Sequence, residues 1–499
     1  MNCGAASRKR RVMWKHDAAI VAFGVCVAGA LASCSGGDSP GITEAPDRYL
    51  ASGVALSRIE SLQSLAVPLV VDGAAVANLA APIVRGVPGA IRIAATLTGD
   101  AAARTKSIAA VGFFDNPSGQ RIVRVSSAHA AEDYAAPSLA STWQLPLDGS
   151  ELQEGTTFRV ALVDADRGEG SAEDARFPKD ATLTPLASEA TGSLEVVLVP
   201  IRWNVDQSGR LPDTSDAQVA VYKSLFERTY PAKHVSISVH APMDFASSGS
   251  FSAVNDALVD LRAKENIDNR AYVHGLMNPA DTFDAFCNDG CTTGLGFVVD
   301  DPADGSIRVS SGTGFTGIDS AWTMVHEVGH QHGRMHAPCG VSGADRQFPQ
   351  RDGTIGLWGY DRSTPTMLNI NSHDFMSYCD QNWVSQYTWA ALLTRIQAVG
   401  IPALEQRSGA SAASVQLVRL VHRRNGEVLF VGAPVRMRMP HAAAVESVVL
   451  EHADGTSTTA MVPRIDTGEV GVDALVVPVE LTSAVKVRGA RFVLPASRP

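Results

Sequence analysis

Residues 326–336 read His-Glu-Val-Gly-His-Gln-His-Gly-Arg-Met-His, and this stretch decides both the local fold and the chemistry. On an α-helix, positions four apart lie about 40° apart around the axis, so His326 and His330 project from one face, one turn apart. Two imidazoles placed in this way can bind the same metal ion. Glu327 lies beside the first histidine, where it can accept a proton from a metal-bound water without occupying a coordination position.

The helix through this stretch should begin near Ser320 or Trp322 and end at Gly333. Glycine tolerates the left-handed backbone that often ends a helix, so the chain can turn there and bring His336 round as a third ligand. Three neutral imidazoles and one water form the open tetrahedral site that is typical of catalytic zinc. Zinc lowers the pKa of bound water towards about 7 and polarises a substrate carbonyl. We therefore predict one catalytic zinc ion.

The same eleven residues match the pattern H-E-x-x-H-x-x-G-x-x-H at every fixed position, so the chain resembles the metzincin zinc metallopeptidases. The resemblance implies that His326, His330 and His336 are the zinc ligands. Glu327 would be the general base, and Gly333 would be the structural glycine at which the helix ends. The alternative is a helix whose histidines bind nothing, which leaves the glycine and the third histidine unexplained.

Metzincins also carry a methionine turn downstream of the third ligand, and residues 373–379, His-Asp-Phe-Met-Ser-Tyr-Cys, resemble it. The resemblance gives Met376 a structural role, as a polarizable side chain that forms an apolar floor beneath the ligands. Tyr378 resembles a tyrosine that donates a hydrogen bond to the tetrahedral intermediate, and ordinary packing is its alternative. We expect His332 to point away from the metal, and His373 to be a turn residue or a proton relay.

A wider segment around these motifs resembles the secreted mucin-cleaving metallopeptidases of bacteria. The stretches that carry this resemblance are Trp322 to His330, His336 to Gly340, Ile355 to Asp361 and Asp374 to Cys379. Gln331 departs from it, because many relatives have asparagine after the second histidine, and this leaves the subfamily open. The resemblance implies a protein or glycoprotein substrate that lies antiparallel to an edge strand, with Leu295 to Val299 as the candidate. Loop 340–372, with Trp358 and Tyr360, would shape the specificity pocket, and loop packing is the alternative for these aromatics.

The first 33 residues have the pattern of an export signal, with a basic segment followed by the apolar stretch Ala18 to Ser33. This stretch is shorter than the ~20 residues that span a bilayer, so a permanent transmembrane helix is the weaker interpretation. Leu31-Ala-Ser-Cys34 resembles the bacterial lipobox, whose cysteine is acylated, and Ser35 resembles the pattern of outer-membrane lipoproteins. We expect an exported chain, attached through a lipid on Cys34 to a bacterial membrane, at the outer membrane or cell surface. An ordinary cleaved signal is the alternative.

Four cysteines remain beyond Cys34, and their even number in an exported chain favours two disulfide bonds. The simplest pairing is Cys287 with Cys291 and Cys339 with Cys379, although the sequence alone allows three pairings. A structural zinc site made of all four thiolates is the alternative. The second bond would tie the segment after the third ligand to the end of the methionine turn and so fix both walls of the metal site.

Composition excludes some classes of protein and of partner. The chain is 45% hydrophobic and only 19% charged, which excludes a long disordered protein. Without the first 33 residues it has 37 Lys and Arg against 51 Asp and Glu, a net charge of about −14. Such an acidic chain argues against nucleic acid as a partner.

A length of 499 residues is too great for one compact core, so two or three domains are expected. Residues 49–200 contain short strand-like runs that favour an all-β sandwich. The clearest are Leu65 to Val71, Ile91 to Leu97, Ile108 to Phe114, Arg121 to Val125, Phe158 to Val163 and Leu194 to Val199. Helical periods and strand-like runs alternate from 201 to 405, which predicts an α/β domain of the metzincin kind. Asn425-Gly426 suits a hairpin in a further β domain, sandwich-like, over 406–499.

We therefore expect a signal peptide over 1–33, a flexible tether over 34–48, and a zinc peptidase domain over 201–405 that is flanked by two all-β domains. The function expected first is that of a zinc endopeptidase acting on extracellular proteins or glycoproteins. A surface lipoprotein that binds glycans or proteins through a non-catalytic zinc site is one alternative, but such a site does not need Glu327. A zinc amidase acting on cell-wall peptides would use the same site. No motif reports cleavage preference, a calcium site or a pro-segment.

Overall fold

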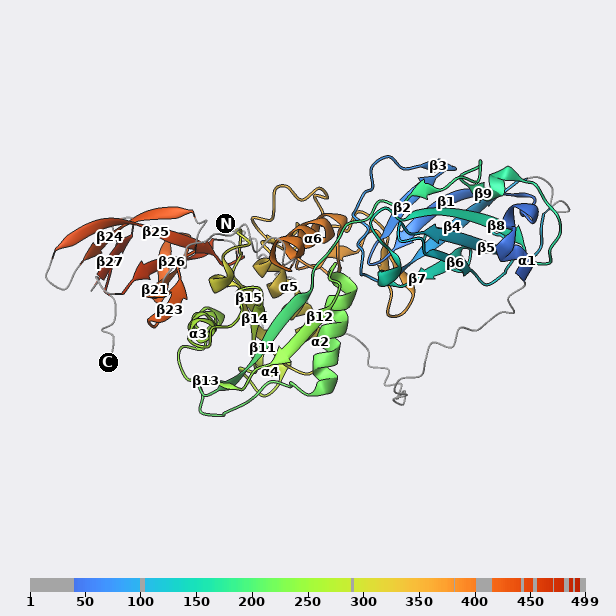
Figure 1. Cartoon of the computed structure of the whole chain (residues 1–499). Coiled ribbons are helices and arrows are strands. Elements are labelled where there is room, and N and C mark those ends of the chain that lie inside the picture. Colours follow the sequence, from blue (N-terminus) through green and yellow to red (C-terminus); the bar gives the residue numbers. More distant parts are fainter. Residues whose placement is uncertain are drawn as a thin grey trace, which may run out of the picture.

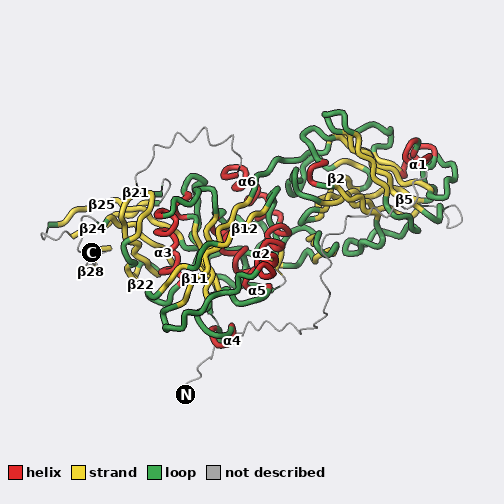
Figure 2. Tube along the Cα trace, turned by 60° about the horizontal axis from the view of Figure 1, so that its bottom comes forward, coloured by secondary structure: helices red, strands yellow, loops and turns green. Residues whose placement is uncertain are grey.

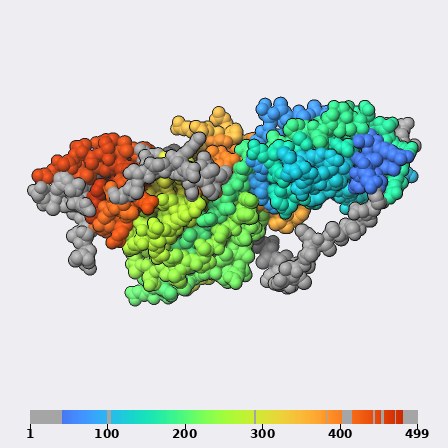
Figure 3. Space-filling model, in the orientation of Figure 1, coloured from blue at the N-terminus to red at the C-terminus, as the bar shows by residue number. Residues whose placement is uncertain are grey.

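The computed structural model describes residues 40–98, 104–288, 291–380, 382–400, 415–440, 444–451, 456–469, 471–479, 484–487 and 490–493. The predicted signal peptide and Cys34 lie outside these residues. Within them the chain is multidomain and rich in strands, with few helices. Figure 1 shows three parts in a row, with a strand-rich part at each end and the longer helices in the middle, and Figure 3 shows the same row in space-filling form. Among the described residues, no helix combines the length and hydrophobicity that crossing a bilayer requires.

The N-terminal part consists of two antiparallel sheets that share one core. The first has the order β3-β2-β1-β4-β7, and the second has the order β10-β8-β5-β6, with β9 on β8. Their bounds are β1 Val54–Leu62, β2 Ala66–Val71, β3 Ala74–Ala75, β4 Gly89–Leu97, β5 Ile108–Asp115, β6 Arg121–Val125, β7 Trp143–Leu147, β8 Thr157–Asp164, β9 Arg176–Phe177 and β10 Thr184–Pro185. Ile59 and Ile93 of the first sheet and Val111 and Leu162 of the second belong to the same buried cluster, so the arrangement is sandwich-like.

Part of the predicted tether is structured. Residues Pro40–Glu44 form the short helix α1, and Pro46–Arg48 form a 3₁₀ turn. Ile42 is buried and belongs to the core of the N-terminal part, although its neighbours in the sequence are turn-forming residues. The expectation of a flexible tether up to residue 48 is therefore corrected, because one apolar side chain anchors its end.

The middle part is built on a mixed sheet with the order β12-β11-β14-β16-β15, and β13 also pairs with β11. Its bounds are β11 Leu194–Trp203, β12 Val235–Val239, β13 Met243–Phe245, β14 Tyr272–Met277, β15 Gly294–Gly296 and β16 Val309–Thr313. All of these pairings are parallel except that of β15, which is antiparallel to β16 and lies at the edge. Since β11 begins at Leu194, the predicted boundary at residue 200 is corrected: it falls inside a strand of this sheet.

Helices cover both faces of the mixed sheet. Their bounds are α2 Asp216–Thr229, α3 Phe251–Lys264, α4 Phe283–Phe286, α5 Ile318–Gln331 and α6 Gln386–Gly400. Val196 and Leu198 of β11 belong to one core with α2 and α5, whereas Val199 and Ile201 belong to another core with α3. Alternate residues of a strand point to opposite faces, which explains this division. Figure 2 shows α2 and α5 on one side of β11 and α3 on the other.

Short strands in the loops after α5 complete the middle part. They are β17 Gly359–Asp361, β18 Thr366–Leu368, β19 His373–Asp374 and β20 Asn382–Trp383. The indole N–H of Trp383 donates a hydrogen bond to the Ser64 carbonyl at 2.7 Å, and that of Trp389 donates to the Pro82 carbonyl at 3.0 Å. These bonds fasten the middle part to the N-terminal sandwich.

The C-terminal part is one antiparallel sheet with the order β22-β21-β26-β25-β24-β27-β28, and β23 also pairs with β21. Its bounds are β21 Val415–Arg424, β22 Glu427–Val431, β23 Val435–Arg438, β24 Val445–Glu451, β25 Ser457–Asp466, β26 Val472–Pro478, β27 Ala484–Val487 and β28 Ala490–Val493. The predicted Asn425-Gly426 hairpin joins β21 to β22, with positive φ at both residues.

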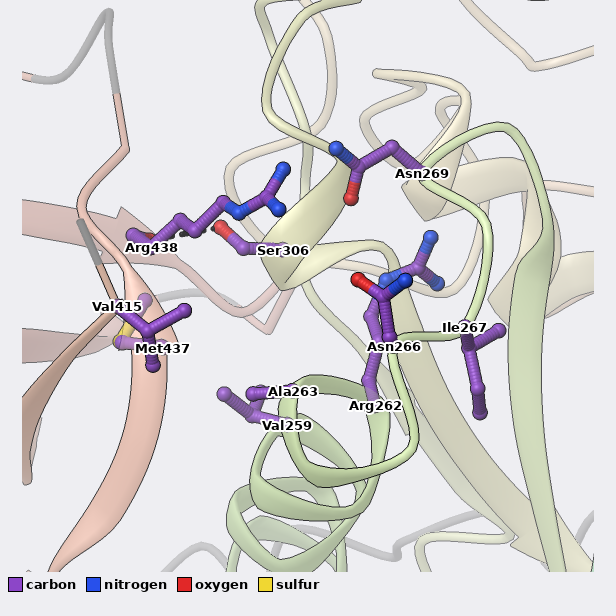
Figure 4. Close-up of a pocket in the computed structure, with 10 residues that line it drawn as sticks. All are labelled: Val259, Arg262, Ala263, Asn266, Ile267, Asn269, Ser306, Val415, Met437 and Arg438. Atoms are coloured by element: carbon purple, nitrogen blue, oxygen red, sulfur yellow. Dashed lines mark hydrogen bonds between the residues drawn. The ribbon is translucent and has the colours of Figure 1, made fainter. Parts of the chain in front are cut away.

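The sandwich-like arrangement of the C-terminal part stays a prediction. On one face of its sheet, residues of β21, β24, β25 and β26 form a separate buried cluster that includes Val421, Leu450 and Leu475. The opposite face packs on α3 of the middle part. A cavity of about 30 Å³ remains at this junction (Figure 4). It is lined by α3, β21, β23 and the loops at 266–269 and 306. Such a volume holds only about two water molecules, so the cavity is not a substrate site.

Candidate metal centre

Helix α5 brings the first two predicted ligands and the predicted base into the interior. The exposed fraction is 9% for His326, 6% for Glu327 and 2% for His330. Gly329 lies between them, on the side of the helix that faces Met376. A Cβ atom at Gly329 would lie 2.4 Å from the Met376 sulfur, so only glycine lets this side chain pack so close to the helix.

Gly333 ends the helical segment, as the sequence predicts. Its φ of 77° lies in the left-handed region, and a Cβ atom would lie 3.0 Å from the Val299 carbonyl oxygen and 2.7 Å from Arg395 Nη2. The backbone N–H of Arg334 donates back to the Gly329 carbonyl at 3.1 Å, which tightens the reversal. The chain therefore turns immediately after α5 and returns His336 to the helix.

The structure brings His326, His330 and His336 together. One ring nitrogen of each lies within 4.8 Å of the other two, and the three side chains are buried. The ring centroids are 4.9 Å apart for the first pair, 5.1 Å for His326 and His336, and 4.7 Å for His330 and His336. Nε2 of His336 is buried and has no hydrogen-bond partner. A buried nitrogen without a partner costs free energy, and a metal ion would satisfy it.

Backbone carbonyls fix the tautomers of two of these histidines. Nδ1 of His326 lies 2.8 Å from the Phe375 carbonyl oxygen, and Nδ1 of His330 lies 2.6 Å from the Arg334 carbonyl oxygen. A carbonyl oxygen can only accept, so each Nδ1 carries the proton and each Nε2 keeps a lone pair for a metal. Burial also lowers the pKa of His326 to about 4 and that of His336 to about 3. The imidazoles are therefore neutral near pH 7, and three neutral nitrogens of this kind fit zinc.

Glu327 lies against the edge strand β15. A Cβ atom at Gly294 would lie 2.6 Å from Oε1 of Glu327, and one at Gly296 would lie 3.2 Å from Oε2. The two glycines thus let the strand backbone contact this carboxyl group directly. Burial raises the pKa of Glu327 well above its ordinary value, and the charge of Glu469 raises it further. Carboxyl groups that are perturbed in this way are typical of functional sites.

The methionine turn lies beneath the histidines. Met376 is buried, and its carbonyl accepts a hydrogen bond from the backbone N–H of Ala337 at 3.0 Å. The buried carboxylate of Asp374 accepts from the backbone N–H of Met376 at 2.8 Å and from that of Ser385 at 2.9 Å. Sequence reasoning did not single out Asp374, although it lies inside the motif. It fixes the turn, and the turn then supplies the Phe375 carbonyl that holds His326.

Tyr378 lies at the rim of the site. Its ring centroid is 4.8 Å from that of His336 and 5.9 Å from that of His326, while the residue as a whole is 51% exposed. Burial of the hydroxyl raises the pKa of Tyr378, and the charges of Glu327 and Glu469 raise it further, so the hydroxyl keeps its proton at neutral pH. It is therefore available as a hydrogen-bond donor.

The two extra histidines lie outside the group of three. His332 donates through Nδ1 to the Val328 carbonyl at 2.9 Å, and its ring stacks on Tyr272 with centroids 4.2 Å apart. His373 bonds through Nδ1 to the Asp380 carbonyl at 3.0 Å and lies near the sulfur atoms of Cys339 and Cys379. Both are structural in this arrangement.

The predicted disulfide pairing is confirmed. Cys287 is bonded to Cys291, and Cys339 is bonded to Cys379. The second bond joins the chain after His336 to the end of the methionine turn, as expected. All four sulfurs are used in this way, so the alternative zinc site of four thiolates does not form.

The prediction that Trp358 and Tyr360 shape a specificity pocket is wrong. Both pack against Leu62 and Ala66 of the N-terminal sandwich. The Trp358 carbonyl accepts from the backbone N–H of Ala66 at 2.8 Å, and the backbone N–H of Tyr360 donates to the Ser64 carbonyl at 2.9 Å. Aromatic residues in a loop do not reveal which surface they will cover, and here they form a domain contact.

Residues 298–393 match the family model described as Peptidase M66. The match includes the whole of α5, all three histidines with Glu327, and the methionine turn, and it supports a metallopeptidase. A metallopeptidase hydrolyses peptide bonds and implies a bound metal.

Other comparisons add little. The crystal structure of metalloproteinase-II from Bacteroides fragilis is similar over 64% of this chain and 89% of that chain, with 12% identity and a TM-score of 0.25. A similarity this weak supports no conclusion about fold or activity. A comparison with curated proteins gave no match.

Proposed function

We propose that this chain is a zinc-dependent endopeptidase of the metzincin kind. The observation that carries the proposal is the convergence of three buried, neutral imidazoles beside the carboxyl group of Glu327. Nε2 of His336 lacks a partner within the protein, and the other two histidines have their Nδ1 atoms engaged. This donor set is the one expected for catalytic zinc, with a fourth position left for water or substrate.

Bound zinc would supply Lewis acidity, which polarises the scissile carbonyl and makes water acidic. The protein supplies the proton transfers and the geometry. Glu327 would accept the proton of the attacking water at a carboxylate oxygen and then deliver it to the leaving amine nitrogen. The hydroxyl of Tyr378 would donate a hydrogen bond to the negative oxygen that develops on the scissile carbonyl.

The edge strand β15 is the proposed binding site for the peptide backbone. Among the described residues it pairs only with β16, and its glycines lie against Glu327. An extended peptide can add to such an edge through main-chain hydrogen bonds. We propose extracellular proteins or glycoproteins as substrates, on the resemblance of the motifs around α5 to mucin-cleaving enzymes.

Export and lipid attachment at Cys34 are also part of the proposal. They are supported by the basic and apolar pattern of residues 1–33 and by Leu31-Ala-Ser-Cys34. The two disulfides of the middle part suit an oxidising compartment outside the cytoplasm.

Lipid attachment is tested by growing a bacterial host with radiolabelled palmitate. The label should be incorporated into the wild-type protein and should be absent from Cys34→Ala.

The mechanism is tested by Glu327→Ala. We expect this variant to keep the fold and one zinc per chain but to lose peptide hydrolysis by about 10²–10⁴-fold, because the general base is gone. Asp319→Ala is the matched control, since it removes an exposed carboxylate from the same helix. Full activity in Glu327→Ala would remove the proposed mechanism.

Substrate class is tested by digestion of an unglycosylated protein and a mucin-type glycoprotein side by side, with and without chelator. Cleavage of the glycoprotein alone, abolished by the chelator, would support the proposed glycoprotein substrate. Binding to the glycoprotein without any cleavage would instead favour a surface lipoprotein with a non-catalytic metal site.

A further inference from the structure

The C-terminal sheet reaches the metal centre through one loop. Residues 466–469, which follow β25 on the way to β26, are called here the β25–β26 turn together with 471–472, and they lie beside the chain that continues from β15. The backbone N–H of Val298 donates to the Asp466 carbonyl at 2.9 Å, and the two residues form an antiparallel bridge. A segment of another domain therefore pairs with the same run of chain that was predicted to bind substrate.

The β25–β26 turn packs directly on a candidate metal ligand. A Cβ atom at Gly468 would lie 2.8 Å from both Cε1 and Nε2 of His330. The φ of Gly468 is 77°, so glycine is favoured there for its backbone as well as for the lack of space. The turn thus covers one flank of the imidazole that faces the metal position.

Glu469 extends the contact of the β25–β26 turn from His330 toward the carboxyl group of Glu327. Its Oε1 accepts a hydrogen bond from the Thr292 hydroxyl at 3.4 Å, and Thr292 lies just before β15. The charge of Glu469 also contributes to the raised pKa values of Glu327 and Tyr378, which places it near both side chains. Glu469 is not one of the residues grouped with the three histidines, so it covers the site without ligating it.

The contact is weak compared with the attachment of the C-terminal sheet as a whole. Among the described residues, two hydrogen bonds join the turn to the middle part, the one from the Val298 N–H and the 3.4 Å bond from Thr292. Its other partners, the Asn425 N–H at 2.7 Å and the exposed Arg424 at 3.4 Å, belong to the C-terminal part. Exposed ion pairs contribute about 0–1 kcal/mol. The sheet itself is anchored elsewhere, through its core with α3. The turn can therefore leave the site while the domain stays in place.

We propose that the β25–β26 turn is an autoinhibitory element that occupies the substrate edge beside β15 and must be displaced before a peptide can bind. This inference rests on the proposed function. An extended peptide that adds to β15 needs the outer edge of the strand and the space over His330 and Glu327. Asp466, Gly468 and Glu469 lie along that same path.

Two substitutions loosen the turn. In Gly468→Ala the new methyl group meets the His330 ring, and in Glu469→Ala the bonds to Thr292 and Arg424 are lost. Gly119→Ala is the matched control, because Gly119 also has positive φ, 85°, but has no atom within 4 Å of the new methyl group. If each substitution destabilises the closed position of the turn by ~1 kcal/mol, a peptide should bind to the variant about five-fold more tightly than to the wild type.

The measurement is the dissociation constant of a tripeptide hydroxamate for the zinc-loaded proteins, with acetohydroxamate as a probe that needs no strand edge. We expect the tripeptide hydroxamate to bind about five-fold more tightly to each turn variant, and acetohydroxamate to bind equally to all. Unchanged or weaker binding of the tripeptide hydroxamate to both variants, at one zinc per chain, would overturn the inference. Tighter binding without peptide hydrolysis in any protein would instead refute the proposed function and leave the inhibitory turn standing.

Discussion

At the scale of single residues, the candidate ligands are oriented by main-chain groups. The carbonyls of Phe375 and Arg334 hold His326 and His330 in the tautomer that a metal requires. The spacing of the histidines predicts that they share a metal, but the Phe375 carbonyl is 49 residues from His326 and every residue has a carbonyl. Such a partner leaves no signal in the sequence. The role of Tyr378, by contrast, can be tested by removing a single oxygen atom from its side chain.

Tyr378→Phe removes only the hydroxyl group. We expect kcat to fall by about 10²-fold with little change in KM, because a donor to the developing oxyanion acts in the transition state. Zinc content should stay at one per chain, since the aromatic ring keeps its place beside His336. Steady-state kinetics on a peptide substrate would measure both constants, and an unchanged kcat would assign Tyr378 to packing alone.

At the scale of elements, the metal centre depends on contact between α5 and the methionine turn. The sequence predicts both elements, because each contains a known motif and Gly333 predicts the reversal that follows α5. β15 begins one residue before the predicted run Leu295 to Val299 and ends three residues before the end of that run, since a strand of three residues that contains two glycines has little hydrophobic pattern. The contact between Gly329 and Met376 was also not predictable, because a glycine inside a helix does not show what packs on it.

Gly329→Ala should force Met376 away from α5, because the new methyl group would lie 2.4 Å from the sulfur. Overpacking of this kind costs about 1–3 kcal/mol of unfolding free energy. Met376→Leu conserves volume and should cost less than about 1.5 kcal/mol. Denaturant unfolding of the zinc-loaded proteins measures both. Equal stability of Gly329→Ala and wild type would contradict the tight contact described between the two elements.

The two disulfides should differ in their contribution to stability. Cys339 and Cys379 are separated by 40 residues and Cys287 and Cys291 by four, so the chain-entropy model gives about 4 kcal/mol for the first bond and about 2 kcal/mol for the second. Replacing each pair by serine and comparing the unfolding free energies tests this order. A larger loss of unfolding free energy on replacing Cys287 and Cys291 would show that the loop-closure model fails for this protein.

At the scale of the whole molecule, the middle part, which carries the candidate metal centre, lies between two β parts that both contact it. Composition and turn patterns predict the order of the parts, and the even number of cysteines in an exported chain suggests two disulfide bonds. The approach of the β25–β26 turn to His330 could not be predicted, because it joins residues far apart in the chain through a glycine. The attachment of the C-terminal sheet also depends on a pair that the sequence does not reveal.

His422 of β21 and Asp256 of α3 form this pair, with Nε2 2.9 Å from Oδ1, and both side chains are buried. Asp256→Ala would leave the buried imidazole without its partner and should lower the unfolding free energy by about 3 kcal/mol. Glu227→Ala, which breaks the exposed pair with Lys223, should cost less than about 1 kcal/mol. Thermal or denaturant unfolding measures the difference. Equal effects of the two substitutions would show that the pair does not anchor the C-terminal sheet.

The central claim is that three imidazoles bind one zinc ion that is needed for hydrolysis. Metal analysis of the purified wild-type protein and of His336→Ala, with peptide hydrolysis measured on the same samples, tests it most directly. The account predicts one zinc per chain and chelator-sensitive hydrolysis for the wild type, and loss of both in His336→Ala. Wild-type protein that hydrolyses peptides without stoichiometric zinc, or that holds no zinc at all, would contradict it.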